Sequence, residues 1–130
     1  MDAVAKDAGI CGGEVMEYKK EGLCYICSPY SGNPLKKIRN VKYARKLTRQ
    51  AIEAGYIPVT PHLYMTQVLN DNIPKERKVG MELGLRLLGH CDTILVGARY
   101  GVSDGMAAEL SEAHKHDINI LIADIEKEKK

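Results

Sequence analysis

The sequence has no phenylalanine and no tryptophan, and tyrosine is its one aromatic residue, with seven copies in 130 positions. A buried core must therefore be built mainly from Leu, Ile, Val, Met and Ala. A tyrosine hydroxyl needs a hydrogen-bond partner once its ring is buried. We therefore expect several tyrosines to lie partly in the core and partly at a polar site.

Long apolar runs are also missing. No stretch approaches the roughly 20 residues that span a bilayer, and the segment from Met1 to Leu23 lacks the continuous apolar region of a signal peptide. We expect no membrane partner and a cytoplasmic location with reduced thiols. The net charge is only +2, and the lysines form no stripe with aromatics between them, so a nucleic-acid polymer is not predicted as a partner.

The four cysteines do not form a recognisable metal or redox motif. Cys24 and Cys27 make a C-x-x-C pair, but a zinc site needs a second pair, and Cys91 stands alone. A redox pair would begin a helix, whereas these two lie in an apolar run typical of a strand, where residues three apart point to opposite faces. We interpret both as small buried residues and predict no metal and no cofactor.

Apolar periodicity and turn residues divide the chain into alternating strands and helices. Asn33 followed by Pro34 predicts a helix start, and Gly55 predicts its end. The predicted strands are 23–27, 56–59, 93–96 and 118–122, and the predicted helices are 34–54, 74–88 and 105–116. Pro58 predicts either an edge position or an irregular ladder for the second strand. Residues 1–21 are interpreted as an N-terminal arm, 22–125 as a single domain and 126–130 as a charged tail.

The helix patterns predict which faces are buried. In the first helix the inward positions are Ile38, Val41, Ala44, Thr48, Ala51 and Ile52. Its basic residues are interpreted as a solvated face, with phosphate binding by Lys36 and Lys37 as the alternative. In the second helix the inward stripe is Val79, Leu83, Leu87 and Cys91, and in the third it is Ala108, Leu110 and Ala113. The second helix is more apolar than one sheet face requires, which favours a homo-oligomer.

This alternation predicts an α/β fold, a Rossmann/flavodoxin-like three-layer sandwich around a parallel sheet of four to five strands. The economical strand order is 2-1-3-4. Ligands in such sheets bind at the carboxyl ends of the strands where the order reverses, here between strands 1 and 3. The loops 28–33 and 97–105 leave those strands and are rich in Gly, Ser and Tyr. We therefore predict one ligand site between these two loops.

The helix that follows the second loop begins near Ser103, and its free N–H groups favour a negative charge. Glu109 lies about one turn into it, where that field is expected to keep the carboxylate ionised. Two interpretations remain open from the residues alone: Ser103 and Glu109 bind a ligand, or Ser103 is only an N-cap and Glu109 only a favourable first-turn acid.

Several segments carry a resemblance to a known family. They are Cys27 to Gly32, Gly55 to Pro58 with Pro61 to Leu63, Asn70 to Arg77, Cys91-Asp92, and the run Ser103-x-Gly105-Met106-x-x-Glu109. Over residues 23–122 the chain resembles a small bacterial and phage family of unknown function. That family is in turn similar to the nucleoside 2-deoxyribosyltransferases.

The resemblance implies cleavage of the N-glycosidic bond of a nucleoside or nucleotide, with water or a second base as acceptor. It implies Glu109 as the nucleophile and Tyr30 as the residue that orients its carboxylate. His62, after the second strand, is expected to hydrogen bond backbone or substrate, with proton transfer as its second possible role. The candidate substrate-binding residues are Ser28, Pro29, Ser31, Gly32, His62, Asp71, Ser103, Asp104, Gly105 and Met106.

Two departures from the transferases bear on activity. The transferases carry an Asp eight residues before the Asp that opens the third strand, and this position is Gly84 here. Glu82 and Asp71 are possible substitutes. The chain also stops soon after the fourth strand, whereas the transferases use a C-terminal segment to complete a neighbouring subunit's site.

The leading hypothesis is therefore an N-glycosidase or deoxyribosyltransferase. The alternatives are a non-catalytic protein that senses or sequesters a nucleotide, favoured by the missing Asp, and a purely structural assembly protein. The sequence does not specify the base, the sugar, a need for a 5′-phosphate, the acceptor, or the general acid.

Overall fold

A four-stranded parallel sheet organises the part of the chain that this computed structural model describes, residues 21–124. The strands are β1 (Leu23–Cys27), β2 (Ile57–Val59), β3 (Thr93–Gly97) and β4 (Asn119–Ala123), and their order in the sheet is β2-β1-β3-β4. All three pairings are parallel, with Tyr25 opposite Val59 on one side and Ile94 on the other. The predicted order 2-1-3-4 is confirmed, and β2, which contains Pro58, is an edge strand.

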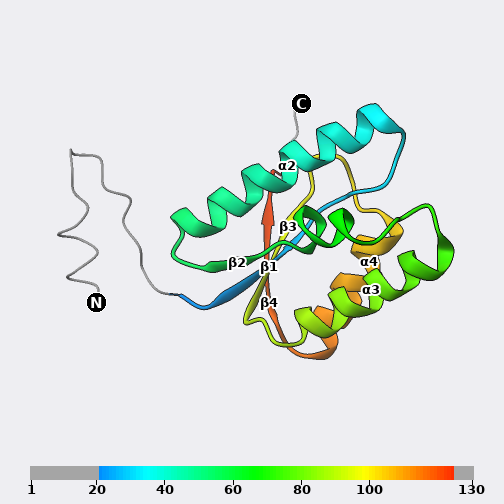
Figure 1. Cartoon of the computed structure of the whole chain (residues 1–130). Coiled ribbons are helices and arrows are strands. Elements are labelled where there is room, and N and C mark those ends of the chain that lie inside the picture. Colours follow the sequence, from blue (N-terminus) through cyan, green and yellow to red (C-terminus); the bar gives the residue numbers. More distant parts are fainter. Residues whose placement is uncertain (1–20, 125–130) are drawn as a thin grey trace.

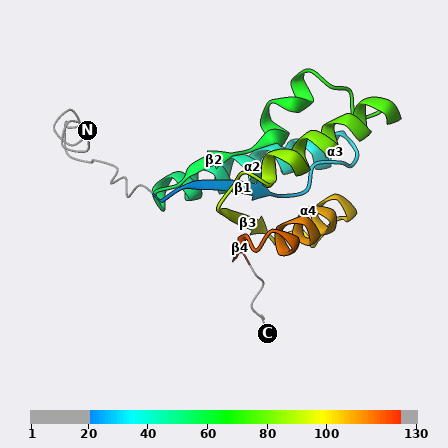
Figure 2. The same ribbon diagram turned by 90° about the horizontal axis from the view of Figure 1, so that it is seen from below.

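Three helices cover the sheet in layers: α2 (Pro34–Glu53), α3 (Pro74–Leu88) and α4 (Asp104–Lys115). Figures 1 and 2 show α2 on one face and α3 with α4 on the other. Two short 3₁₀ turns, Pro61–Leu63 and Met65–Gln67, occupy the segment predicted as a loop after β2. The result is the predicted three-layer α/β sandwich, in which every long connection between parallel strands passes through a helix.

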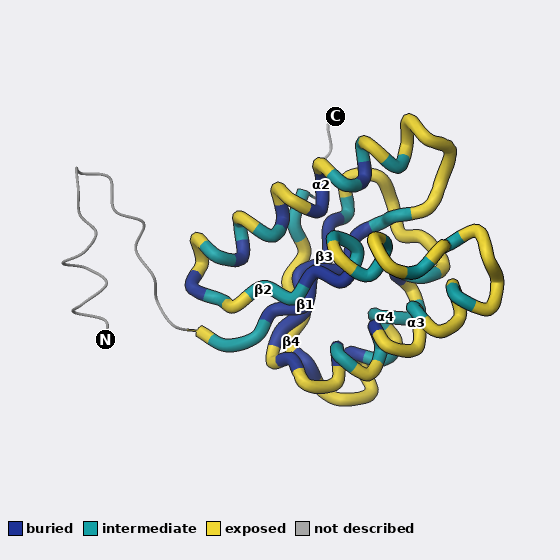
Figure 3. Tube along the Cα trace, in the orientation of Figure 1, coloured by how far each residue is buried: buried dark blue, intermediate teal, exposed yellow. Residues whose placement is uncertain are grey.

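The core has two parts because successive strand residues point to opposite faces. Cys27 lies with Tyr25 and Ile94 under α3 and α4, whereas Cys24 lies with Ile26 under α2. The two cysteines are therefore buried on opposite faces as free thiols, as the strand interpretation predicts. Figure 3 shows the buried residues concentrated along β1 and β3.

The boundaries of α2 follow the predicted signals. The Asn33 side chain accepts a hydrogen bond from the Lys36 amide at 2.8 Å, and Pro34 opens the helix. The chain leaves α2 through Gly55, whose φ of +97° suits glycine.

The buried face of α2 differs from the predicted one. The helix buries Asn40, Tyr43, Ala44, Leu47 and Ala51, whereas Ile38 is 56% exposed. The face is rotated because Tyr43 and Leu47 bring large side chains to the sheet and Asn40 supports the preceding loop. An apolar stripe chosen by residue type alone therefore missed a buried asparagine.

The predicted stripe of α3 is only half right, because Leu87 and Cys91 pack in the core but Val79 and Leu83 do not. The helix buries Gly84 and Leu88, while Val79 and Leu83 are exposed. Glycine at position 84 has no side chain, and this side of α3 lies against the Tyr25 hydroxyl, which a Cβ here would approach to 2.9 Å. The apolar residues displaced from the core remain on the surface.

The sheet is not covered over its whole width. Within residues 21–124, the β4 side chains Ile120, Leu121 and Ile122 are each more than a third exposed. The three-layer packing is therefore incomplete at this edge within the described residues.

Two further expectations concern the ends of the chain and the membrane. The predicted arm 1–21, apart from Glu21, and the predicted tail 126–130 lie outside the described residues. No helix in the described range is long and apolar enough to cross a bilayer.

Candidate active site

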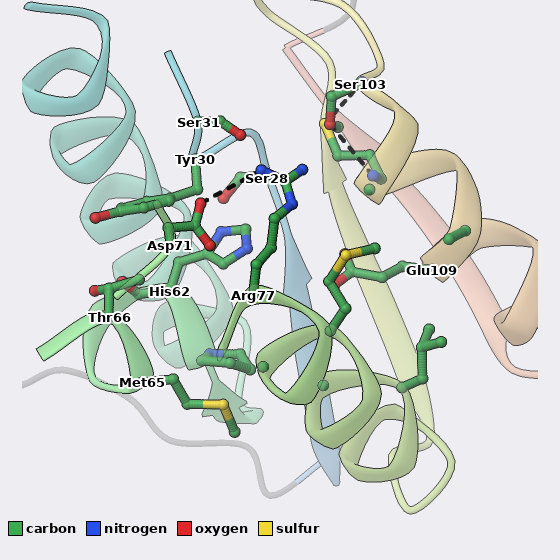
Figure 4. A pocket seen from close by; sticks show the side chains of 18 of the residues that line it. Ser28, Tyr30, Ser31, His62, Met65, Thr66, Asp71, Arg77, Ser103 and Glu109 are labelled. Carbon is green, nitrogen blue, oxygen red and sulfur yellow. Dashed lines mark hydrogen bonds and ion pairs between the residues drawn. The ribbon is translucent and has the colours of Figure 1, made fainter. Parts of the chain in front are cut away.

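A pocket of about 290 Å³ opens at the carboxyl ends of β1 and β3, between α3 and α4 (Figure 4). This volume is near the lower end of the range of about 300–1,000 Å³ typical of small-molecule sites. The loops after β1, β2 and β3 form its rim. Its lining residues are Tyr25, Ser28, Tyr30, Ser31, Pro61, His62, Met65, Thr66, Leu69, Asp71, Glu76, Arg77, Gly80, Met81, Gly84, Leu85, Ser103, Asp104, Gly105, Met106, Ala108 and Glu109.

Glu109 is the carboxylate of this pocket that is held by a tyrosine. The Tyr25 hydroxyl, on β1, donates a hydrogen bond of 2.7 Å to Glu109 Oε2, on α4. The Tyr25 ring is almost wholly buried, so its hydroxyl is fixed relative to the sheet. The carboxylate therefore has one oxygen positioned by the core.

Burial raises the pKa of Glu109 to about 7, and the hydrogen bond from Tyr25 opposes part of that rise. The expectation that the helix field keeps Glu109 ionised is therefore wrong near neutrality. Desolvation of the carboxylate outweighs the partial charge of the α4 N-terminus, which falls off within the first turn. Glu109 exchanges its proton in the pH range where many enzymes work.

The expected partner of Glu109 was Tyr30, yet the hydroxyl that contacts the carboxylate belongs to Tyr25. Tyr30 also lines the pocket, but its ring lies 5.5 Å from the His62 ring, centre to centre. Strand β1 points Tyr25 under α4, whereas Tyr30 is five residues further along and beyond the end of the strand. Sequence reasoning missed Tyr25 because a tyrosine inside an apolar strand has the signature of a core residue.

Gly84 lies beside this pair. A Cβ at this position would stand 2.9 Å from the Tyr25 hydroxyl and 3.9 Å from Glu109 Oε2. The position where the transferases carry an Asp is thus adjacent to Glu109, but here it supplies no acid. Of the two suggested substitutes, Asp71 lines the pocket and Glu82 does not.

Eight of the ten predicted binding residues line the pocket, and Pro29 and Gly32 do not. Gly32 instead makes the turn into α2: its φ is +140°, and a Cβ there would stand 2.8 Å from Lys36 Cβ. Asp104, Gly105 and Met106 line the pocket as the first turn of α4.

The serines of the two loops differ in what they contact. Ser28 is buried and its Oγ has no hydrogen-bond partner in the described structure. Ser103 accepts a hydrogen bond of 3.3 Å from the Met106 amide, so it is the N-cap of α4 as well as a pocket residue. Ser28 has hydrogen-bonding capacity left for a ligand.

His62 joins the pocket from the segment after β2. Burial lowers its pKa, with nearby Asp71 acting in the opposite direction, so the ring is neutral near pH 7. Its Nδ1 is buried without a partner. A neutral imidazole next to Tyr30 offers a ligand a flat wall and one free ring nitrogen.

Two further residues were missed by sequence reasoning. Asn40 Nδ2 donates to the carbonyl oxygens of Tyr30 and Ser31, each at 3.2 Å, and so anchors the loop after β1 to α2. Arg77, from the first turn of α3, lies 3.6 Å from Asp71 Oδ2 and lines the pocket. Asn40 had no signal in the sequence, whereas Arg77 lay within the segment Asn70 to Arg77 that carries the family resemblance.

Among the residues described, no three His, Cys, Asp or Glu side chains are grouped to hold a metal ion. A second, more open cavity lies outside the pocket and is lined by Arg39, Lys42, Lys46 and Arg99 with Tyr43 and Tyr100. The fold therefore gathers cations and tyrosines that the linear sequence keeps apart. The absence of a nucleic-acid partner stays a prediction.

Comparison with known proteins assigns the chain to a family. Residues 22–123 match the model of a domain of unknown function, DUF7768. The chain belongs to this family. No curated protein matches it. Among solved structures, it is similar to a 2-deoxyribosyltransferase from the psychrotolerant bacterium Bacillus psychrosaccharolyticus. The two chains are 16% identical with a TM-score of 0.57, over 79% of this chain and 75% of the other. At that identity the likeness establishes the shared α/β fold.

Proposed function

We propose that this DUF7768 protein cleaves the N-glycosidic bond of a nucleoside or nucleotide, with Glu109 as the nucleophile. The observation that carries the proposal is the Tyr25–Glu109 hydrogen bond of 2.7 Å in a nucleoside-sized pocket. The 2-deoxyribosyltransferase of similar fold supports the substrate class. A carboxylate fixed at one oxygen has its other oxygen free to attack a sugar carbon.

The chemistry follows the double displacement of retaining glycosyl transfer. In the first step, ionised Glu109 forms a bond to the anomeric carbon while the bond from that carbon to the base nitrogen breaks. In the second, water or another base attacks the same carbon and frees Glu109. Tyr25 is the positioning residue, since it contacts the carboxylate and also lowers the pKa of Glu109. Ser28, Ser103 and Gly105 are proposed to contact the sugar or a phosphate.

A non-catalytic nucleotide-binding role is the second candidate. Gly84 favours it, because the pocket lacks the acid that the transferases carry at this position. Such a protein would bind a nucleotide through the same loops and release no base.

A chromatographic assay separates the two candidates. A panel of ribo- and deoxyribonucleosides and their monophosphates is incubated with the protein, and free base is measured. Release of base, with a deoxyribosyl or ribosyl adduct on the Glu109 peptide in mass spectrometry, is the expected result. Ligand-dependent thermal stabilisation with no base from any compound would instead support the binding protein.

We also propose that the protein is a homo-oligomer. The surface of α3 exposes Val79, Met81 and Leu83, and β4 exposes Ile120 and Ile122, all more than a third accessible. Exposed apolar side chains in excess of what the core uses favour a contact surface. Light scattering at micromolar concentration is expected to give a multiple of 14.4 kDa, and a monomeric mass would contradict the proposal.

A further inference from the structure

Arg77 is the one Lys or Arg among the residues that line the pocket. Its single ion pair in the described structure joins Nη1 to Asp71 Oδ2 at 3.6 Å. Charge-assisted hydrogen bonds are usually about 2.7–2.9 Å long, so this contact is loose. The guanidinium therefore keeps N–H donors for a ligand, while Asp71 holds it toward the pocket.

The position of Arg77 relative to Glu109 suggests what it contacts. In Figure 4 the guanidinium reaches from α3 into the pocket, with Asp71 and His62 on one side and Glu109 on the other. When the sugar lies over Glu109, the base lies against the rest of the pocket wall, which includes His62, Tyr30 and Arg77. The positive charge thus lies on the side where the base must leave.

The leaving base creates a chemical requirement that glycine at position 84 cannot meet. When the glycosidic bond breaks, its electron pair moves onto the base nitrogen, so an unprotonated base becomes an anion. Gly84 supplies no acid, and burial lowers the pKa of His62, which disfavours its protonated form. The carboxylate of Glu76 is already engaged, because its Oε1 accepts a hydrogen bond of 2.6 Å from the Asn70 amide. A permanently charged guanidinium can stabilise such an anion without giving up a proton.

We infer that Arg77, held by Asp71, binds the departing base of the substrate and stabilises the negative charge that develops on it. This inference rests on the proposed function and deepens it. The substrate class is a nucleoside or nucleotide whose base spreads that charge over ring nitrogen and carbonyl oxygen atoms, which accept hydrogen bonds from the guanidinium. The released base then takes its proton from water, and the sugar stays on Glu109 until the acceptor attacks.

The test compares two leaving groups. The first substrate is a purine 2′-deoxynucleoside, and the second is its N7-methylated form, whose cationic base leaves as a neutral molecule. Arg77→Gln removes the charge but keeps a polar side chain. We expect it to lower kcat/KM at least tenfold on the first substrate and less than about twofold on the second. Arg86→Gln, an exposed change in the last turn of α3, is the matched control and is expected to leave both rates unchanged.

The outcomes are distinguishable. Equal losses on both substrates, or no loss on either, would overturn the role of Arg77 while leaving the glycosidic chemistry intact. Release of base by the wild-type protein from neither substrate, nor from any compound of the panel, would overturn the proposed function and this inference with it. Glu109→Gln gives the background rate for the reactive N7-methylated compound, and circular dichroism checks that the Arg77 variant is folded.

Discussion

Glu109→Gln is expected to reduce base release at least about a thousandfold, because glutamine has no carboxylate to form the glycosyl intermediate. Its side-chain oxygen can still accept the hydrogen bond from Tyr25, so the pocket is expected to keep its shape. Free base is measured by chromatography, and the intact mass of each protein reports the covalent adduct. Activity equal to wild type would exclude Glu109 as the nucleophile.

The same variant is expected to be more stable than wild type above pH 7. The pKa of Glu109 is about 7 in the folded protein, against an ordinary value of 4.5, so the folded state holds this proton more tightly. The native state therefore loses stability as pH rises from about 4.5 to about 7, by up to about 3 kcal/mol. Glutamine does not ionise and escapes this loss.

Denaturant unfolding of both proteins at pH 5 and pH 8 measures the effect. The stability advantage of Glu109→Gln is expected to be small at pH 5 and large at pH 8. Glu112→Gln is the matched control on the same helix. Glu112 contacts His116 and Lys115 near the surface, so its loss is expected to change stability little. An advantage of Glu109→Gln that does not vary with pH would contradict the burial of an ionisable group.

Loss of the proton from Glu109 is expected to raise activity, although it lowers stability. The nucleophile must be ionised, so the wild-type rate is expected to rise with pH through about 7, where the protein is losing stability. Burial of Glu109 thus lowers the stability of the folded protein and brings the pKa of the carboxylate close to the pH at which the protein is expected to work.

The sequence was sufficient for the strand order and for the place of the pocket. Strand residues such as Ile94 and Val96 are apolar and β-branched, and turn formers separate them from helices of matching period. Parallel connectivity then determines where the loops after β1 and β3 meet. Glu109 and most of the predicted loop residues are in the pocket for this reason.

Contacts that depend on how closely elements approach were beyond sequence reasoning. Tyr25 has the sequence signature of a core residue, yet its hydroxyl contacts Glu109, and glycine at position 84 leaves room for that hydroxyl. The pKa of Glu109 depends on burial by residues far away in sequence, which helix position alone does not reveal. In the sequence, Arg77 is one of many charged residues, and the fold places it in the lining of the pocket.

The close approach at Gly84 leads to the last large effect. Gly84→Ala is expected to reduce the rate about a hundredfold, because the new Cβ would stand 2.9 Å from the Tyr25 hydroxyl and displace it from Glu109. Loss of that hydrogen bond is also expected to raise the pKa of Glu109, so the activity profile should move to higher pH. The rate of base release against pH measures both changes.

Helix propensity alone predicts that Gly84→Ala increases the stability of the protein. Replacing a helical glycine by alanine usually stabilises a protein by about 0.5–1 kcal/mol. Gly80→Ala, one turn earlier, is expected to show this gain, since its Cβ would meet only Leu69 Cδ1 at 3.4 Å. Gly84→Ala is not expected to show this gain, because its Cβ would clash with the Tyr25 hydroxyl.

A double-mutant cycle with Tyr25→Phe separates the mechanism from general damage. Phenylalanine lacks the hydroxyl that the new methyl group displaces, so Gly84→Ala should cost little further activity in that background. Independent, multiplying losses would mean that alanine disturbs the pocket by another route. Strong coupling would mean that glycine at position 84, where the transferases place an acid, serves here to let a strand tyrosine hold the nucleophile.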